Sequence, residues 1–248
     1  MTEETVPAGA GRTAGRDRDR RRSALRFARD VAIIAVVALL VSFLVKTFVV
    51  RSFYIPSGSM ENTLQIQDKI IVNELQPSVF PLARGDVVVF RDPGGWLPRT
   101  APVRQNPVSQ AIDTTLTFVG LSASDSDDHL VKRIIGLPGD RVTCCSAAGS
   151  LTVNGVAIDE PYILVPPGQQ NAATLAFDVT VPAGELWVMG DNRYASQDSS
   201  RNQALPGHGF VPVSAVVGRA FVVSWPANRW TGLDDYPEVF ARVEERSG

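Results

Sequence analysis

Histidine, the usual general base of a serine hydrolase, is scarce in this chain. The 248 residues include only His129 and His208. His129 follows the acidic stretch 125–128, which predicts a solvated surface position, and His208 lies in the loop-like sequence Pro-Gly-His-Gly. The chain has no Gly-x-Ser-x-Gly motif and no pair of histidines with metal-ligand spacing. A Ser-His-Asp triad and a zinc centre are therefore disfavoured, and hydrolytic chemistry would need another base.

Lysine is also scarce, which directs attention to each of the three lysines in the chain. Lys69 adjoins Asp68, which predicts a surface ion pair. Lys132 lies in an apolar, strand-like run, and the alternation of a strand places Leu130 and Ile134 on its face. Loss of water around an ammonium group disfavours its charged form and lowers the pKa. Lys132 is therefore a candidate base, and the alternative is a lysine on an edge strand that extends its amine into solvent.

A turn rich in serine supplies the candidate partner of this base. Residues 55–60 read Ile-Pro-Ser-Gly-Ser-Met, and Pro and Gly favour a tight turn that presents hydroxyl and backbone N–H groups together. A lysine of ordinary pKa, about 10.4, accepts protons poorly at pH 7, whereas a neutral lysine can take a proton from a serine. A serine in this turn is either such a nucleophile or a cap of the next element.

An apolar segment precedes this turn and predicts a membrane anchor. Within residues 31–50 only three residues are not apolar, and twenty helical residues span about 30 Å, the thickness of the hydrocarbon core of a bilayer. Eight arginines precede the segment, so its N-terminal end is expected in the cytoplasm. We expect a basic, largely disordered cytoplasmic tail over 1–30, one transmembrane helix over 31–50, and an extracytoplasmic domain over 51–248. A cleaved signal peptide is disfavoured because no A-x-A-like site follows.

The remainder of the chain predicts a mostly β, antiparallel domain. Short β-branched runs alternate with turn residues, and no helical periodicity of useful length follows residue 50. Asn154-Gly155 predicts a two-residue hairpin turn within a smaller β-subdomain near 143–184. Residues 92–128, rich in Pro, Gly, Ser and Asp, predict a mobile insertion. Strands are expected near residues 66–74, 86–91, 130–135, 150–158, 177–181, 185–189 and 216–225.

The two cysteines of the chain, Cys144 and Cys145, are adjacent. They cannot link distant segments, and they lack metal-ligand spacing. Two free thiols in a turn are favoured over a vicinal disulfide, and neither cysteine has an expected catalytic role.

Four motifs follow the apolar segment in a fixed order: Pro-Ser-Gly-Ser-Met at 56–60, Arg-Gly-Asp-Val-Val-Val-Phe at 84–90, Lys-Arg-Ile-Ile-Gly-Leu-Pro-Gly-Asp at 132–140, and Gly-Asp-Asn-Arg at 190–193. With these motifs the chain resembles bacterial type I signal peptidases, the membrane-bound serine proteases that remove signal peptides from exported proteins. The resemblance covers about residues 31–225. It implies a signal-peptidase-like catalytic β-domain behind the membrane anchor.

The resemblance also implies a role for each matching residue. Ser59 matches the nucleophile and Lys132 the general base. Ser57 matches the side-chain donor of the oxyanion hole, in which the backbone N–H of Ser59 is the second donor. Ser196 matches the hydroxyl that orients the lysine. Four charged residues match positions that support the site through ion pairs: Arg133, Asp191, Arg193 and Asp198. The extra serine in Asp198-Ser199-Ser200-Arg201 departs from the family pattern and leaves the role of Arg201 open.

The partners implied by the resemblance are exported preproteins with A-x-A-type cleavage sites and the phospholipid bilayer of the cell membrane. Neither a metal nor an organic cofactor is implied, and a net charge of −2 at pH 7 disfavours a strongly basic nucleic-acid-binding protein. Five aromatic residues could form an apolar collar at the headgroup level, although Phe53 and Trp225 are at least as readily core residues. This hypothetical collar comprises Phe53, Tyr54, Trp96, Trp225 and Trp230.

Two alternatives keep parts of this interpretation. The first is a Ser-Lys protease of the self-cleaving repressor type, but such proteins carry a DNA-binding helix-turn-helix where this chain has its apolar segment. The second is a non-catalytic, membrane-anchored β-domain that binds exported chains, which is disfavoured because both candidate catalytic groups are present.

Overall fold

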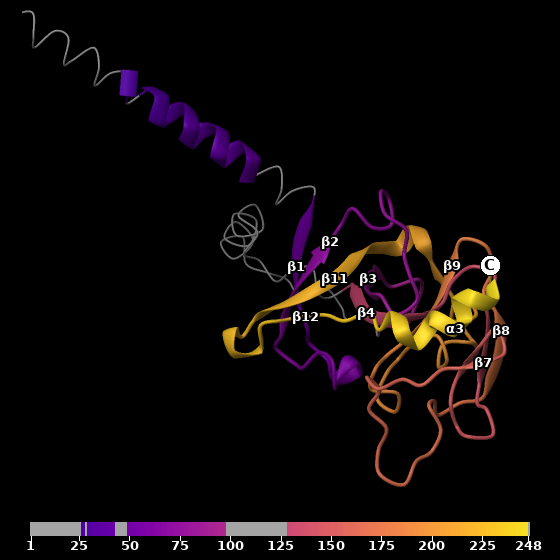
Figure 1. Ribbon diagram of the computed structural model, residues 1–248. Helices are drawn as coiled ribbons and strands as arrows, with labels where there is room; N and C mark the ends of the chain where they lie inside the picture. The colour runs from indigo at the N-terminus through magenta and orange to yellow at the C-terminus, as the bar shows by residue number, and fades with distance from the viewer. Residues whose placement is uncertain (1–25, 28, 43–48, 98–127, 248) are drawn as a thin grey trace, which may run out of the picture. The chain divides into compact units, whose positions relative to one another are not determined.

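The computed structural model describes residues 26–27, 29–42, 49–97 and 128–247. The chain divides into two compact units, Met1–Thr47 and Phe48–Gly248. In the first unit, residues 29–42 are helical and exposed (Figure 1). Among the described residues, no helix combines the length and the apolar character that a membrane crossing requires. Part of the predicted transmembrane helix over 31–50 and most of the predicted tail over 1–30 lie outside the described residues.

The second unit contains a large antiparallel sheet, which confirms the predicted mostly β class. Its strand order is β1-β2-β11-β3-β4-β9-β10, and β12 pairs with β11. All of these pairs are antiparallel, and Figure 1 shows the long β11 beside β2 and β3. The strands are β1 (Val50–Tyr54), β2 (Lys69–Asn73), β3 (Val87–Arg91), β4 (His129–Gly136), β9 (Glu185–Met189), β10 (Val211–Pro212), β11 (Val216–Trp225) and β12 (Thr231–Gly232).

A second, four-stranded sheet has the order β7-β6-β5-β8. The predicted hairpin at Asn154-Gly155 joins β6 to β7, and both residues have positive φ, 53° and 75°, as a type I′ turn requires. The strands of this sheet are β5 (Arg141–Cys144), β6 (Thr152–Val153), β7 (Val156–Ala157) and β8 (Phe177–Thr180). Most of the predicted insertion over 92–128 lies outside the described residues.

The prediction that no helix follows residue 50 was wrong, because α3 (Pro237–Ser247) is an α-helix. Phe240 and Val243 are fully buried in the cluster that also contains Trp187 of β9. The apolar stripe of this helix is distinct but short, with Val239, Phe240 and Val243 as its members within eleven residues, so the sequence offers too few turns to reveal it. The described part of the chain also contains the 3₁₀ helices η1 (Gly58–Met60), η3 (Val213–Ala215) and η4 (Ala227–Arg229).

The centre of the large sheet is covered on both faces. In β3 the four residues Val87 to Phe90 are all buried, with Val87 and Val89 in one apolar cluster and Val88 and Phe90 in another. Because side chains alternate between the two faces of a strand, a continuous apolar run of this kind needs a core on each side. β4, the strand next to β3, is therefore held rigidly between two packed layers.

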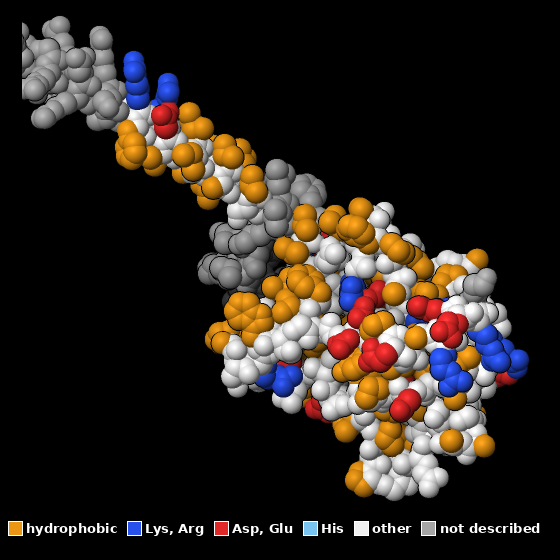
Figure 2. Space-filling view, viewed as in Figure 1, with side chains coloured by type: hydrophobic (Ala, Val, Ile, Leu, Met, Phe, Trp, Pro, Cys, Tyr) orange, Lys and Arg blue, Asp and Glu red, His pale blue; other side chains and the backbone are white. Residues whose placement is uncertain are grey.

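The hypothesis of an aromatic collar is corrected by the burial of its members. Trp96 is only 6% exposed and packs edge-on against Phe90, so it is a core residue, and Phe53 is buried as well. Trp225, at the end of β11, and Trp230, just before β12, are exposed. Figure 2 shows hydrophobic side chains gathered at this end of β11 and β12.

Candidate active site

The serine-rich turn is held by the strand ends on either side of it. The N–H of Ile55, just after β1, donates to the carbonyl of Asp68, and the Gln67 N–H donates to the carbonyl of Ile55, both at 2.9 Å. Met60 is buried in the apolar core and fixes the far end of η1. Between these anchors Ser59 is half-buried, where its hydroxyl can meet both the protein and a bound chain.

Lys132 lies on β4 opposite Val88 of β3 and is 3% exposed. Its Nζ lies 2.8 Å from Ser59 Oγ and donates to the Val131 carbonyl at 2.9 Å. The alternative of a lysine that extends its amine into solvent is wrong, because the side chain is buried and its amine contacts Ser59. The structure thus brings together the two groups that the sequence placed in separate segments.

The surroundings of Lys132 lower the pKa of its amine. Burial, which penalises the charged ammonium, lowers the pKa of Lys132 to about 8, and the charges of Asp198 and Asp191 oppose this shift. At pH 7 about a tenth of such an amine is uncharged, whereas a lysine of ordinary pKa is almost wholly protonated. The amine can therefore accept a proton close to physiological pH.

The two other predicted serines are placed differently. Ser57 is exposed, and its Oγ lies 3.5 Å from Ser59 Oγ. Ser196 is 2% exposed, and among the described residues its Oγ has no hydrogen-bond partner. A Cβ added at Gly190 would collide with Ser196 Oγ and with the carbonyl oxygen of Ser59. Gly190 is therefore required for Ser196 and the Ser59 backbone to approach each other.

A buried ion pair joins β4 to the segment after β9. Arg133 donates through Nε and Nη2 to the two oxygens of Asp191 at 3.0 and 2.8 Å, and both side chains are fully buried. The Arg133 guanidinium also donates to the Gly85 carbonyl and lies 4.1 Å from the ring centroid of Tyr162. Thr63, in the segment after η1, donates to Asp191. This network connects the Ser59 segment to β4, which carries Lys132.

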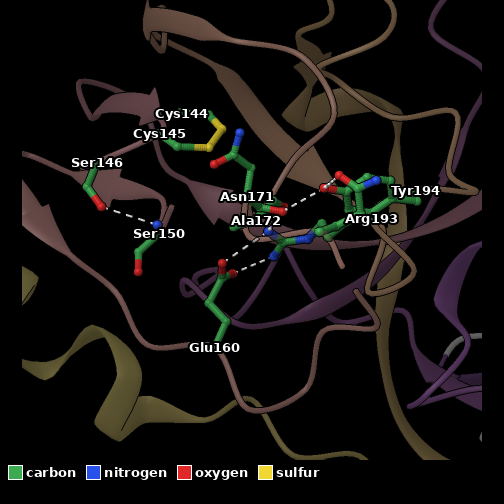
Figure 3. Close-up of a disulfide and its surroundings, with 10 residues drawn as sticks. Cys144, Cys145, Ser146, Ser150, Glu160, Asn171, Ala172, Arg193 and Tyr194 are labelled. Atoms are coloured by element: carbon green, nitrogen blue, oxygen red, sulfur yellow. Dashed lines mark hydrogen bonds and ion pairs between the residues drawn. A yellow bond between two sulfur atoms is a disulfide. The ribbon is translucent and has the colours of Figure 1, made fainter. Parts of the chain in front are cut away.

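A second buried ion pair is tied to the backbone at Gly190. Arg193 binds both carboxylate oxygens of Glu160 and donates to the Gly190 and Ala172 carbonyls, each at 2.9 Å. Figure 3 shows this guanidinium between Glu160 and Ala172. Arg193 therefore acts on the site through the backbone of Gly190.

The same view contains a disulfide between Cys144 and Cys145 (Figure 3). The prediction of two free thiols was wrong. The pair ends β5, where Cys144 is buried against the apolar core of the smaller sheet. Adjacency in the sequence prevented the pair from linking distant segments, but it did not prevent the two sulfurs from bonding.

Asp198 is held beside Gly190 by Ser200, the second of the two serines that follow it. Its carboxylate accepts from the Gly190 N–H at 3.1 Å and from Ser200 Oγ at 2.7 Å. Arg201 is exposed and donates to the Tyr194 carbonyl at 2.9 Å. Ser200 thus supplies a hydroxyl to Asp198, and the guanidinium of Arg201 lies on the surface.

Two further expectations are corrected. Asp68 forms a two-point ion pair with Arg229, at 2.9 and 3.0 Å, and not the predicted pair with Lys69, because Asp68 is buried and the Lys69 side chain is exposed. His129, expected at the solvated surface, is half-buried on β4 with its ring 5.4 Å from that of Phe53. His208 lies in a turn, as its loop-like sequence predicts. In the described part of the chain, no cluster of His, Cys, Asp and Glu could hold a metal ion.

Asn192 and Glu160 are site residues that the sequence reasoning did not single out. Asn192 donates through its backbone N–H to the Ser59 carbonyl and through Nδ2 to the Gly58 carbonyl, both at 3.1 Å. Its place within the Gly-Asp-Asn-Arg motif was the available signal. Glu160 lies in a loop with no motif, so only the fold reveals that it is the partner of Arg193.

A serine hydroxyl and a buried, weakly basic lysine at hydrogen-bonding distance are the groups that a Ser-Lys hydrolase requires. On an antiparallel β scaffold they indicate the class of serine hydrolases. A family model described as "Signal peptidase, peptidase S26" matches residues 28–225. The chain belongs to this family and is therefore a peptidase.

Individual relatives agree with the family model. The "Probable signal peptidase I" of Mycobacterium leprae (strain TN) is 38% identical over 260 residues, covering 94% of this chain and 87% of that protein. The "Signal peptidase I" of Mycobacterium tuberculosis (strain CDC 1551 / Oshkosh) is 38% identical over 219 residues, covering 82% and 74%. The "Probable signal peptidase I-2" of Synechocystis sp. (strain ATCC 27184 / PCC 6803 / Kazusa) is 36% identical, covering 82% and 76%.

Proposed function

We propose that this chain is a membrane-bound serine endopeptidase that cleaves signal peptides from exported preproteins with Ser59 and Lys132. The observation that carries the proposal is the 2.8 Å contact between Ser59 Oγ and the buried amine of Lys132. Membership of the signal peptidase family supports the choice of substrate. No metal or organic cofactor enters the reaction, because the amine itself serves as the base.

In the proposed reaction, neutral Lys132 takes the proton of Ser59 as Ser59 Oγ attacks the carbonyl carbon of the scissile peptide bond. Ser57 Oγ–H and the Ser59 N–H donate to the oxyanion, and one such donor is worth about 10²–10³ in rate. Protonated Lys132 then gives its proton to the leaving amine, the C–N bond breaks, and an acyl-enzyme on Ser59 remains. Water, deprotonated by Lys132, hydrolyses this ester and restores the serine.

The remaining site residues hold these groups in place. Ser196, whose buried Oγ has no hydrogen-bond partner among the described residues, is the hydroxyl proposed to orient the Lys132 amine. Arg133 with Asp191, and Arg193, fix the backbone on which the site is built. Asp198 accepts a hydrogen bond from Gly190, and its charge keeps the pKa of Lys132 from falling further.

The preprotein is bound as an added strand beside the Ser59 and Lys132 segments. β9 pairs with β4 only from Arg133 onward, so residues 130–132 have no paired strand on that side within the described part of the sheet. An extended peptide can use such an edge for main-chain hydrogen bonds, with alternate side chains entering pockets. Shallow apolar pockets at two alternate positions would select the small residues of an A-x-A site.

The location follows from the apolar segment before β1. A single transmembrane helix over 31–50, with eight arginines before it, places the N-terminus in the cytoplasm and residues 51–248 outside the cell membrane. The phospholipid bilayer is then the second partner of the chain, beside exported preproteins. Nucleic acid is not a partner.

Cleavage of a purified preprotein by the wild type, Ser59→Ala and Lys132→Ala tests the catalytic proposal. Both variants are expected to lose cleavage, because one lacks the nucleophile and the other lacks the base. Thermal unfolding of each variant is the control for folding. Retained processing by either folded variant would remove the mechanism, and a wild type that binds preprotein without cutting it would favour a non-catalytic binding domain.

A further inference from the structure

The backbone around Ser59 is held by one residue from a distant part of the chain. Asn192 follows β9 and is only 7% exposed. Its Nδ2 donates to the Gly58 carbonyl and its backbone N–H donates to the Ser59 carbonyl, both at 3.1 Å. These carbonyls belong to the peptide groups on either side of Ser59. Asn192 therefore restrains both of the peptide planes that flank the proposed nucleophile.

The restraint on Gly58 also determines the direction of the Ser59 N–H. A trans peptide group is planar, so its C=O and the following N–H point in opposite directions. The Gly58 carbonyl accepts from Asn192 Nδ2 and from the Glu61 N–H, the latter also at 3.1 Å. With this oxygen held by two donors, the plane cannot rotate freely, and the Ser59 N–H is directed to the side opposite Asn192.

Glu61 holds the amide of Asn192 in the orientation that this contact needs. An amide nitrogen carries two hydrogens, and here the second one is donated to Glu61 Oε2 at 3.1 Å. The Glu61 carboxylate lies over Gly58, where a Cβ would be 2.7 Å from its Cδ. The absence of a side chain at Gly58 thus makes room for the carboxylate that orients Asn192.

Asn192 itself stands on a rigid support. Leu164 forms a parallel β-bridge with Asn192, and the Leu164 N–H donates to the Asp191 carbonyl at 2.7 Å. The side chain of Asp191 is bound by Arg133 in the buried ion pair. The Ser59 N–H, held in this way, does not need to reorient when the oxyanion forms. Such preorganisation is what makes a hydrogen-bond donor effective in stabilising the transition state.

We propose that Asn192 is a positioning residue that aims the Ser59 N–H at the oxyanion, with Glu61 fixing its amide. This inference rests on the proposed role of Ser59 as nucleophile. The amide touches neither the substrate nor Lys132 in the proposal, so its loss acts on the transition state through the backbone. Its expected signature is a fall in kcat with little change in KM.

The test uses the purified full chain with a purified preprotein and compares Asn192→Ala and Asn192→Asp with the wild type. Asn192→Asp keeps the volume but replaces the donor with a carboxylate that faces the Gly58 carbonyl. Both variants are expected to lower kcat by about 10²–10³, the value of one oxyanion donor, and to change KM by less than about threefold. In Asn192→Ala the pH at which activity rises is expected to stay at the wild-type value, because the contacts of Lys132 are untouched.

Asn154→Asp is the matched control, because Asn154 also donates through Nδ2 to a carboxylate, that of Asp140 at 2.8 Å, but lies in the β6–β7 hairpin. It is expected to lower the unfolding temperature without a large fall in kcat. A kcat within about twofold of wild type in folded Asn192→Ala would overturn the inference. An equal loss of kcat in Asn154→Asp, measured in a variant that unfolds at the same temperature as Asn192→Ala, would also overturn it. An active Ser59→Ala would instead overturn the proposed function, so the two failures are distinguishable.

Discussion

A lysine amine is a useful base near neutral pH only where its charged form is disfavoured. At Lys132 the main cause is burial on a central strand, and two carboxylates limit the effect, so that the pKa is lowered to about 8. A fully unopposed burial would lower the pKa further and would leave a weaker base, while an exposed lysine would remain protonated. The balance at this residue therefore suits proton transfer from Ser59.

The proposed role of Ser196 can be tested by removing its hydroxyl. If its buried hydroxyl orients the Lys132 amine, Ser196→Ala is expected to lower kcat by up to about 10²-fold, the cost of misplacing a reacting group. If Ser196 Oγ accepts from the ammonium in the working enzyme, its removal disfavours the charged form of Lys132, so the pH at which activity rises should move downward. The pH profile of kcat for the folded variant checks both expectations. An unchanged rate and profile would show that Ser196 has no role in orienting Lys132.

At the scale of elements, the sequence predicted the strands whose apolar pattern is unambiguous. β9 and β11 have the predicted bounds, β3 begins one residue later than predicted, and β4 extends one residue further at each end. α3 was missed because it exposes many charges and buries only one short stripe, and the brief β5, β10 and β12 lack a pattern of useful length. Element type is readable from periodicity only over several residues.

The candidate site was less accessible to sequence reasoning than the strands. The strand that carries Lys132 was predicted from its apolar pattern. Its position in the sheet depends on the pairing of β3, β4 and β9, which cannot be predicted from a local pattern. The partners of the charged residues were also hidden, since Glu160 pairs with Arg193 and Arg229 with Asp68 across long separations. Motif order identified the residues, and tertiary packing alone determines what they contact.

The apolar segment over 31–50 is expected to anchor the chain in a membrane, and this expectation can be tested on the whole segment. The full chain is expected to resist alkaline extraction from membranes, because the proposed 20-residue apolar helix would be buried in the hydrocarbon core. In spheroplasts, protease added outside should digest residues 51–248 and leave an antibody epitope within residues 1–30 intact. Release by alkaline extraction, or digestion of the N-terminal epitope, would contradict the anchor or its orientation.

At the scale of the whole molecule, the site depends on segments that are far apart in the chain. Ser59 comes from the turn after β1, Lys132 from β4, and Gly190 and Asn192 from the segment after β9. Two fully buried arginine–carboxylate pairs, Arg133–Asp191 and Arg193–Glu160, fix that segment from both sides. Breaking one partner of such a pair leaves an uncompensated buried charge, so the network couples the geometry of the site to the integrity of the fold.

The pH dependence of kcat/KM for preprotein cleavage by the wild type tests the central claim most directly. Because Lys132 must be neutral to accept the proton of Ser59 and has a pKa lowered to about 8, activity should rise roughly tenfold per pH unit below that value and level off above it. The measurement covers roughly pH 6 to 9. A rise with its midpoint near pH 8 is the predicted result, and a flat profile over this range would contradict a role for Lys132 as the base.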